Sequence, residues 1–297
     1  MRFTNASPIT GLSLLGSLLF GACMSASDEQ SSGASRPSAS PQEGSTGSAA
    51  AAWVDPLVKH NWMQLQGGAI DIGVGGKSAA RPIPWVIGND GGHSLWKFGW
   101  SSGGWNGKGY SAKAIDVAAD GTPWFVDNNN LVHTLGTDGG FLTYRGAAAR
   151  DVGAGAGGTT WIIGTSLVSG STDYEIYRFV TNGWVKAAGG GVRIDVDNNG
   201  NPWICNSIGD VYQGNPTGTT WGRKGGIVAK DISVGAYAGQ AVVYAISNEP
   251  DGNDFQVYRY YNSKWEPVNA SGVRISTDYN GYPWVVTASG IVKAAVY

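Results

Sequence analysis

The chain has 297 residues, a formal net charge of −2, and only 14% charged residues. Nucleic-acid binding normally needs a basic face, so this charge balance argues against a nucleic-acid partner. The 47 glycines and 13 tryptophans give a composition poor in helix formers and rich in turn and strand residues, which favours an all-β fold.

Residues 1–22 are expected to be an export signal. Arg2 supplies a positive charge, and the apolar run 9–20 is too short to be a stable membrane anchor. The motif Phe-Gly-Ala-Cys that ends at Cys23 resembles a bacterial lipobox, in which the cysteine becomes lipidated and begins the mature protein. The sequence therefore predicts lipidation of Cys23; ordinary secretion with cleavage near Ala26 is the alternative.

Residues 23–52 are rich in Ser, Gly and Pro and almost free of large apolar side chains. Such a segment cannot bury enough surface to fold, so we expect a disordered, flexible tether. Met24 stands where an Asp would resemble an inner-membrane retention signal, so we expect anchoring in the outer membrane. The folded domain is then expected to cover residues 53–297.

From Trp62 to the C-terminus, one pattern of apolar, polar and aromatic residues occurs six times. Each unit has an opening aromatic, a β-like run with a polar slot, a second aromatic run and a closing apolar run. The opening aromatics are Trp62, Trp105, Phe141, Trp184, Trp221 and Trp265; the polar slots are Asp71, Asp116, Asp151, Asp195, Asp231 and Ser276; the second aromatics are Trp85, Trp124, Trp161, Trp203, Tyr244 and Trp284. A period of roughly 40 residues with several strands per unit is typical of a β-propeller.

The strands of each unit can be placed by alternation. In the run 69–75, apolar residues alternate with Asp71 and small residues, which suits an inner strand near a central axis. The last unit ends at Tyr297 without an outer strand, whereas the outer-type strand at Trp62 has no unit before it. We therefore expect an all-β, six-bladed β-propeller whose ring is closed by the N-terminal strand, because closure removes exposed edges.

The units alternate in length, so the sequence has pseudo-threefold symmetry of long and short units. The extra length of the long units lies between their second and third strands, in the loops 88–94, 164–174 and 247–255. These loops are expected on one face, beside the links from each outer strand to the next inner strand. Function on a rigid repeat scaffold usually lies in such loops.

The recurring Trp-x-x-apolar, Ile-Asp-Val-Gly, Pro-Trp-apolar-apolar and Ile-Tyr-Arg motifs resemble the tectonin family of β-propeller lectins over residues 62–297. The resemblance implies binding of cell-surface glycans, such as lipopolysaccharide components or methylated sugars. Departures from the motif occur at Phe141, Tyr244 and Ser276, in slots that look structural. No individual ligand residue carries over, because the matched positions belong to the framework.

The candidate ligand residues are polar and aromatic side chains of the long units. Carboxylates and amides offer the paired donors and acceptors that vicinal hydroxyls require. The candidates are Asn89, Asp90, His93, Trp96, Trp100, Asp173, Tyr174, Asn248, Asp251 and Asn253. For each of them, a solvated loop residue that binds nothing is the alternative.

Other polar features are expected to be structural. The repeated slot aspartates are expected to bond neighbouring backbone and hold blades together, rather than to serve catalysis or a metal. The run from Asp195 to Gly200 begins like a calcium loop, but Asn206 replaces the required Glu, so a hairpin turn is expected. Cys205 is expected to be a buried apolar residue without a disulfide partner.

These features predict a monomeric glycan-binding protein that is not an enzyme and needs no cofactor or metal. An enzyme should break the repeat at one place with acid, base or metal-ligating residues, and no such concentration occurs. Two other functions remain as alternatives, a protein-interaction or adhesion scaffold without a sugar ligand and a propeller lyase or hydrolase.

Overall fold

The computed structural model describes residues 60–76, 81–181, 183–237 and 239–296. Chain contacts divide the protein into two units, 1–51 and 52–297. The expected signal peptide, the lipidation residue Cys23 and the expected tether lie outside the described residues. Within the described ranges, no helix is long and apolar enough to cross a membrane.

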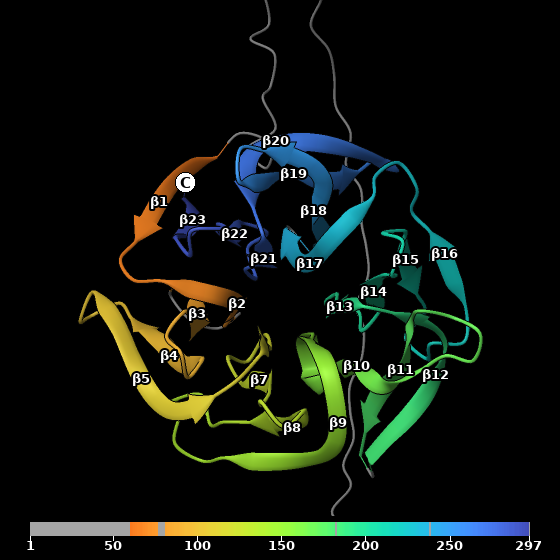
Figure 1. Ribbon diagram of the computed structural model, residues 1–297, viewed down its shortest axis with the longest axis horizontal. Coiled ribbons are helices and arrows are strands. Elements are labelled where there is room, and N and C mark those ends of the chain that lie inside the picture. Colours follow the sequence, from red (N-terminus) through yellow and green to blue (C-terminus); the bar gives the residue numbers. More distant parts are fainter. Residues whose placement is uncertain (1–59, 77–80, 182, 238, 297) are drawn as a thin grey trace, which may run out of the picture. The chain divides into compact units, whose positions relative to one another are not determined.

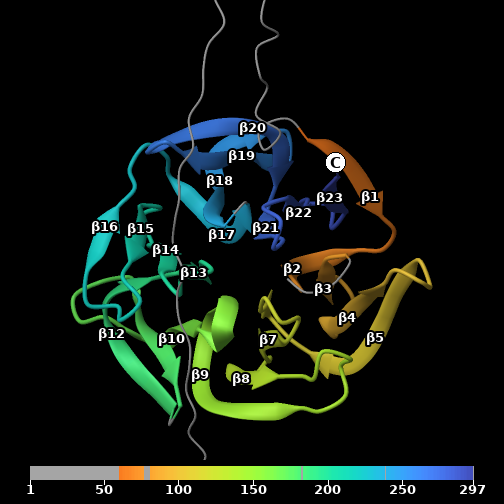
Figure 2. The ribbon, with the colours of Figure 1, turned by 180° about the vertical axis from the view of Figure 1, so that it is seen from behind.

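The second unit is built from antiparallel strands that form five hydrogen-bonded sheets around a common axis (Figures 1 and 2). The first sheet contains β2 (Ala69–Gly75), β3 (Ile83–Gly88), β4 (Ser94–Gly99) and β5 (Gly104–Ser111). Another contains β13 (Arg193–Val196), β14 (Pro202–Cys205), β15 (Val211–Gly214) and β16 (Trp221–Arg223). The next contains β17 (Ala229–Tyr237), β18 (Gln240–Asp251), β19 (Asp254–Tyr261) and β20 (Lys264–Gly272).

The two remaining sheets complete the ring. One contains β21 (Arg274–Thr277), β22 (Pro283–Val286), β23 (Val292–Val296) and β1 (Asn61–Leu65). The other has seven strands: β6 (Ala114–Val117), β7 (Pro123–Val126), β8 (Leu131–Thr134), β9 (Thr143–Ala154), β10 (Thr160–Leu167), β11 (Tyr174–Val180) and β12 (Gly183–Gly191). The only other regular element in the described part of the chain is a short 3-10 turn, Ala156–Gly158.

The seven-stranded sheet spans two of the units in the repeat. The first half of β9 pairs with β8, from Thr143 to Ala148, and the second half pairs with β10, from Ala149 to Ala154. Hydrogen bonding therefore gives five sheets where the repeat predicts six separate blades. The structure shows an all-β, propeller-like arrangement.

The expected closure by the N-terminal strand is confirmed. β1 pairs with β23 in antiparallel register, from Asn61 opposite Val296 to Leu65 opposite Val292. Trp62 Nε1 also donates a hydrogen bond to the Asn269 carbonyl on β20 (3.0 Å). The strand that precedes the first unit thus completes the sheet of the last one.

The polar slots link the inner strands into a closed ring of hydrogen bonds. In each step the slot side chain accepts a hydrogen bond from a backbone N–H on the next inner strand. The N–H donors and their acceptors are Ile115 to Asp71 (3.2 Å), Ala154 to Asp116 (2.6 Å), Ile194 to Asp151 (2.9 Å), Val234 to Asp195 (2.6 Å), Ile275 to Asp231 (3.1 Å) and Val74 to Ser276 (2.9 Å). The predicted structural role of the slots is confirmed.

The inner strands approach one another too closely for ordinary side chains at some positions. A Cβ on Gly73 would lie 2.7 Å from Asp116 Cα, and one on Gly153 would lie 2.6 Å from Asp195 Cα. Glycine is required there because any side chain would displace the neighbouring backbone. This explains the small residues that alternate with apolar ones in the inner strands.

Most of the periodic aromatics pack between sheets, as expected. Trp85 and Trp161 are fully buried, and Tyr244 is also fully buried in a slot otherwise held by Trp. Phe141 is different, because it is 85% exposed and lies outside β9. Thr134 pairs with Thr143, so strand register places Leu142 in the slot that the sequence pattern assigned to Phe141. That assignment was wrong by one residue.

Candidate functional site

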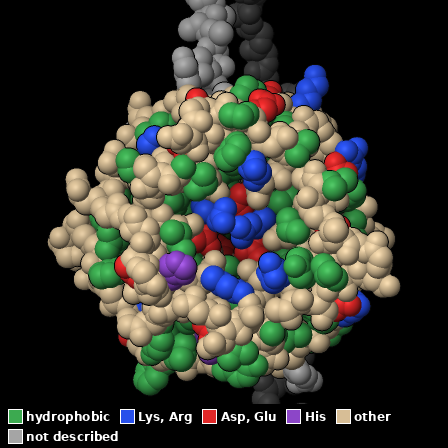
Figure 3. Space-filling model, in the orientation of Figure 1, with side chains coloured by type: hydrophobic (Ala, Val, Ile, Leu, Met, Phe, Trp, Pro, Cys, Tyr) green, Lys and Arg blue, Asp and Glu red, His purple; other side chains and the backbone are tan. Residues whose placement is uncertain are grey.

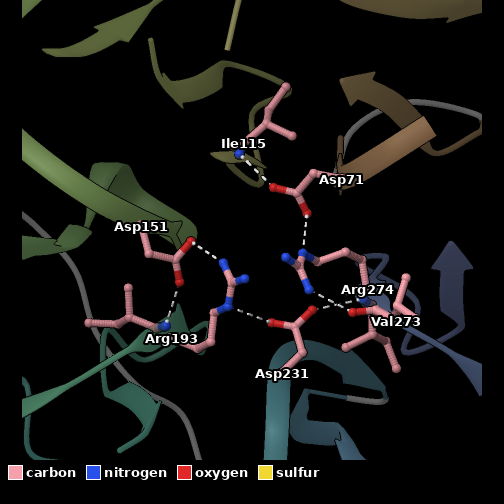
Figure 4. A network of polar contacts seen from close by, with 9 residues as sticks. Asp71, Ile115, Asp151, Arg193, Asp231, Val273 and Arg274 are labelled. Atoms are coloured by element: carbon pink, nitrogen blue, oxygen red, sulfur yellow. Dashed lines mark hydrogen bonds and ion pairs between the residues drawn. The ribbon is translucent and has the colours of Figure 1, made fainter. Parts of the chain in front are cut away.

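Three carboxylates and two guanidinium groups meet at the centre of the ring (Figure 4). Asp71, Asp151 and Asp231 are slot residues of the long units, and Arg193 and Arg274 begin the inner strands β13 and β21. Arg193 lies between two carboxylates, with Nη1 3.5 Å from Asp151 Oδ1 and Nε 3.7 Å from Asp231 Oδ1. Arg274 Nε lies 3.7 Å from Asp71 Oδ1. We call this set the axial charge layer.

Burial controls the ionisation of the carboxylates on the axis. It raises the pKa of Asp71 to about 7 and that of Asp151 to about 6, against the opposing effect of the two arginines. Deeper on the axis, burial likewise raises the pKa of Asp195 to about 7 and that of Asp116 well above its usual range. Asp116 and Asp195 share a side-chain hydrogen bond, so one of them holds a proton.

The axis itself has little free space. The cavity around the axial charge layer has a volume of about 30 Å³, and a second cavity beyond Asp116 and Asp195 has about 40 Å³. A water molecule needs about 10–15 Å³ of such space, so each cavity holds a few waters and no sugar ring. The axis therefore has no room for a ligand as large as a sugar ring.

The long loops share one side of the ring with the links between consecutive units. Asn89 N donates to the Gly68 carbonyl (3.2 Å), Ala112 N to the His93 carbonyl (3.0 Å) and Asn248 N to the Val228 carbonyl (2.8 Å). We call this side the loop face. It is the face on which the sequence predicted ligand binding.

Several candidate ligand residues on the loop face build the loops themselves. Asp90 Oδ1 accepts hydrogen bonds from the backbone N–H groups of Gly92 (3.0 Å) and Ser94 (3.1 Å), which hold the pKa of Asp90 below its usual value. Trp96 Nε1 donates to the other oxygen of Asp90 at 3.4 Å. These contacts stabilise the turn in which His93 adopts a left-handed backbone conformation (φ 52°).

The other candidates do not converge on one site. Asp173 accepts a hydrogen bond from Ser207 N (2.6 Å), and Tyr174 lies 4.2 Å beneath the Arg150 guanidinium. Trp100 lies in the turn between β4 and β5, at the opposite end of β4 from the loop face, and donates to the Pro82 carbonyl (2.7 Å). Asn248, Asp251 and Asn253 are exposed along the β18–β19 hairpin. The structure therefore does not assemble these residues into one pocket.

A larger pocket lies between the outer strand β5 and the strands β7 and β8. This pocket, groove 1, has a volume of about 390 Å³. It is lined by Gly109, Tyr110, Ser111, Phe125, Asp127, Asn128, Asn129, His133 and Leu142. The rings of Phe125 and His133 are stacked at 5.4 Å, and His133 Nε2 lies 3.2 Å from Asp127 Oδ2. The open surface of the groove is thus formed by Tyr110, Leu142 and the amides of Asn128 and Asn129, above the buried rings of Phe125 and His133.

A second pocket, groove 2, occupies the corresponding place between the last long unit and the last short unit. Groove 2 lies between β20 and the sheet of β1, with a volume of about 250 Å³. It is lined by Trp62, Gln64, Asp251, Asn269, Ala270, Ser271, Val285 and Lys293. Val285 pairs with Lys293 across its floor, as Phe125 pairs with His133 in groove 1. Asp251 is the candidate from the sequence that lines a groove.

Groove 1 was not predicted from the sequence, because its residues come from several strands of two units. Two signals were present in the sequence: the polar run 127–130 in a short unit, and the adjacent apolar residues Phe141 and Leu142 in a loop. Leu142 is 44% exposed beside the groove. Large exposed apolar residues beside polar groups are typical of binding surfaces.

Comparison with models of known protein families gives no match, and comparison with curated protein sequences gives none either. Among solved structures, a gluconolactonase from Xanthomonas campestris is similar, with a TM-score of 0.54 and 9% identity, covering 80% of this chain and 90% of its own. A protein of unknown function from Bacteroides thetaiotaomicron has a TM-score of 0.53 and 10% identity, covering 82% and 75%. YCF48 from Cyanidioschyzon merolae has a TM-score of 0.49 and 13% identity, covering 79% and 98%. At such low identities the first two likenesses show the fold alone, and that fold is the β-propeller.

Proposed function

We propose that this chain is an exported β-propeller that binds cell-surface glycans, such as lipopolysaccharide components or methylated sugars, without enzymatic activity. The observation that supports this most is the lining of groove 1. The half-buried Tyr110 and the exposed Leu142 provide apolar surface for the C–H face of a sugar, and the exposed Asn128 and Asn129 provide donors and acceptors for its hydroxyls. The groove is open and shallow, so the affinity of one site is modest.

Two separated grooves on one rigid ring favour a repetitive ligand. Grooves 1 and 2 both lie between the outer strand of a long unit and the following short unit. A glycan chain or a glycan-covered surface can engage both, which raises the effective affinity without any new contact. Differences in lining, such as His133 against Lys293, give the two grooves different sugar preferences.

The ring is best described as six blades, two of which share a sheet. The six slot hydrogen bonds return to the first inner strand, and β9 serves as the outer strand of one unit and the inner strand of the next. Together with an acyl anchor on Cys23 and a tether over residues 23–52, this ring would present its grooves at the outer membrane as a monomer.

Tyr110→Ala tests the proposal, with the purified full chain applied to a broad glycan array. We expect saturable, sugar-competable binding by the unchanged protein and a loss of affinity of roughly fivefold or more for the variant, because a buried aromatic contact is typically worth more than about 1 kcal/mol. Tyr212→Ala is the matched control, since Tyr212 is also a half-buried tyrosine packed against the core but lies outside both grooves. A folded protein that binds no glycan on the array would instead favour the protein-interaction scaffold.

A further inference from the structure

Basic side chains gather around the axis on the loop face. Figure 3 shows Lys and Arg side chains around a central hollow, with acidic side chains at its floor. The five basic residues next to the inner-strand starts are Lys113, Arg150, Arg193, Lys230 and Arg274. We call the opening that these five residues surround the axial mouth. Its floor is the cavity whose charged lining residues are Arg193, Asp71, Asp116, Asp151, Asp195 and Asp231.

In the part of the chain that the structure describes, the outer three of these cations form no ion pair, although Asp127 acts on Lys113 from a longer distance. Within the described ranges, no carboxylate lies within 4.0 Å of the charged groups of Lys113, Arg150 or Lys230. Arg150 is held over the Tyr174 ring at 4.2 Å, and Lys230 over the Phe255 ring at 4.3 Å. Aromatic faces position these cations at the mouth without neutralising them.

The two arginines at the floor keep hydrogen-bonding capacity for a ligand. A guanidinium group has five N–H donors, and its dedicated carboxylate contacts are usually about 2.7–2.9 Å long. The contacts of Arg193 and Arg274 with the axial carboxylates are 3.5–3.7 Å, and their side chains are 21% and 31% exposed. Figure 4 shows the guanidinium groups approaching each other across the axis.

We propose that the axial mouth is an anion-binding site, which takes a carboxylate or phosphate group between the guanidinium groups of Arg193 and Arg274. Paired guanidinium forks match the planar carboxylate and the oxygens of phosphate. Lys113, Arg150 and Lys230 add attraction from the rim. The cavity beneath the arginines is lined by five aspartates and is too small for a sugar ring, so the ligand stays on the loop-face side of the two guanidinium groups.

The role of the arginines as counterions of Asp71, Asp151 and Asp231 does not account for the whole cluster. The three rim cations are directed by aromatic and amide groups instead. Neutralising the buried carboxylates beneath the arginines would not require cations at the rim.

Calorimetric titration of the purified full chain tests the site with three probes: inorganic phosphate, galacturonate and galactose. We expect saturable binding of at least one anionic probe that weakens as salt is raised. Comparing the affinities for phosphate and galacturonate shows whether the site prefers a phosphate or a carboxylate group. Galactose reports on the grooves alone, so failure of the axial site leaves the glycan proposal intact, and the reverse also holds.

Arg274→Gln locates the binding. We expect it to weaken anion binding roughly tenfold, by about 1.4 kcal/mol, because it removes one charged fork. Lys264→Gln removes the same charge from the exposed first residue of β20 and should leave binding unchanged. If Arg274→Gln does not fold, the double variant Arg150→Gln/Lys230→Gln replaces it, since both side chains are exposed. Equal affinity in the folded variant and its control, or no anion binding by the unchanged protein, would overturn the proposal.

Discussion

At the residue scale, the side chain in each polar slot must satisfy two conflicting requirements, hydrogen bonding and burial. The slot must accept a backbone hydrogen bond between neighbouring inner strands, and it must do so on a buried axis. Asp71 meets the first requirement through Ile115 N, but its ionised form loses solvation there, which raises its pKa to about 7. Ser276 performs the same linking role for Val74 N without a charge. The fold therefore needs an acceptor at the slot rather than a carboxylate.

A pH dependence of stability follows from this conflict. Asp71 faces Arg274, Arg193, Asp231 and Asp151, and its pKa of about 7 in the fold lies above the unfolded value near 3.8. The folded state therefore binds more protons between about pH 4 and pH 7, and this group's contribution to stability falls as the pH rises through that window. Buried Asp151 and Asp195, with pKa values of about 6 and 7, act in the same direction.

We expect a melting temperature higher at pH 5 than at pH 8, by roughly 3 °C or more. Asp71→Asn keeps an acceptor for Ile115 N and cannot ionise, so it should reduce this difference. The exposed Asp251→Asn should leave it unchanged. Differential scanning calorimetry at the two pH values measures both effects. A melting temperature that rises from pH 5 to pH 8 would contradict the burial argument.

At the scale of elements, the short strand β1 carries a large share of the closure. It supplies the outer edge of the last sheet, buries Leu65, and joins β20 through the Trp62 indole. Without it, β23 becomes an exposed edge, and the apolar residues beneath lose cover. The five residues of β1 therefore contribute strongly to the stability of the ring.

Deletion of residues 51–66 should destabilise the ring far more than deletion of residues 24–50. We expect a melting temperature lower by roughly 10 °C for the first deletion, since several kcal/mol of burial and pairing are lost. The second deletion removes a segment that we expect to be a tether, and its melting temperature should match that of the full chain. Equal melting temperatures of the two variants would argue against a closing role for β1.

The sequence predicted those elements whose local pattern repeats. Inner strands followed from glycine and apolar alternation, and the hairpin turn in the run from Asp195 followed from Gly200, whose φ value is 80°. The repeat predicted separate outer and inner strands in the region of β9. The alanine-rich stretch 147–149 contains no residue that ends a strand, so β9 continues through both. The register of Phe141 depends on a loop whose length the pattern cannot specify.

The candidate sites were harder to predict for a physical reason. Polar residues in the long loops suggested recognition, yet Asp90 and Asp173 use their carboxylates to fix loop backbone. Groove 1 brings Tyr110 to Phe125 across two units, with ring centroids 6.5 Å apart, and such proximity exists only after the sheets pack. The axial mouth depends on Arg193 and Arg274, which begin the inner strands of two short units. The remaining short unit has Ala114 at this position, so the repeat does not predict the arginines.

At the scale of the whole molecule, the proposed anchor would hold the proposed grooves and axial mouth near a glycan-covered cell surface. An acylated chain cannot diffuse away from its membrane, so many copies would face a glycan-covered surface together. Affinity that is modest for one groove then becomes retention through several simultaneous contacts. The biological effect of the propeller would thus depend on the N-terminal cysteine as much as on the grooves.

Cys23→Ala tests this dependence. We expect the variant to move from the membrane fraction to the soluble fraction, because the predicted acceptor of the lipid is gone. Cys205→Ala is the matched control, since it removes the other cysteine, which is fully buried in β14 and has its pKa raised by that burial. The control should stay in the membrane fraction, and immunoblots of the two fractions measure both outcomes. Retention of Cys23→Ala in the membrane would show that the chain is held there by something other than a lipidated cysteine, and glycan avidity would then need another source of multivalency.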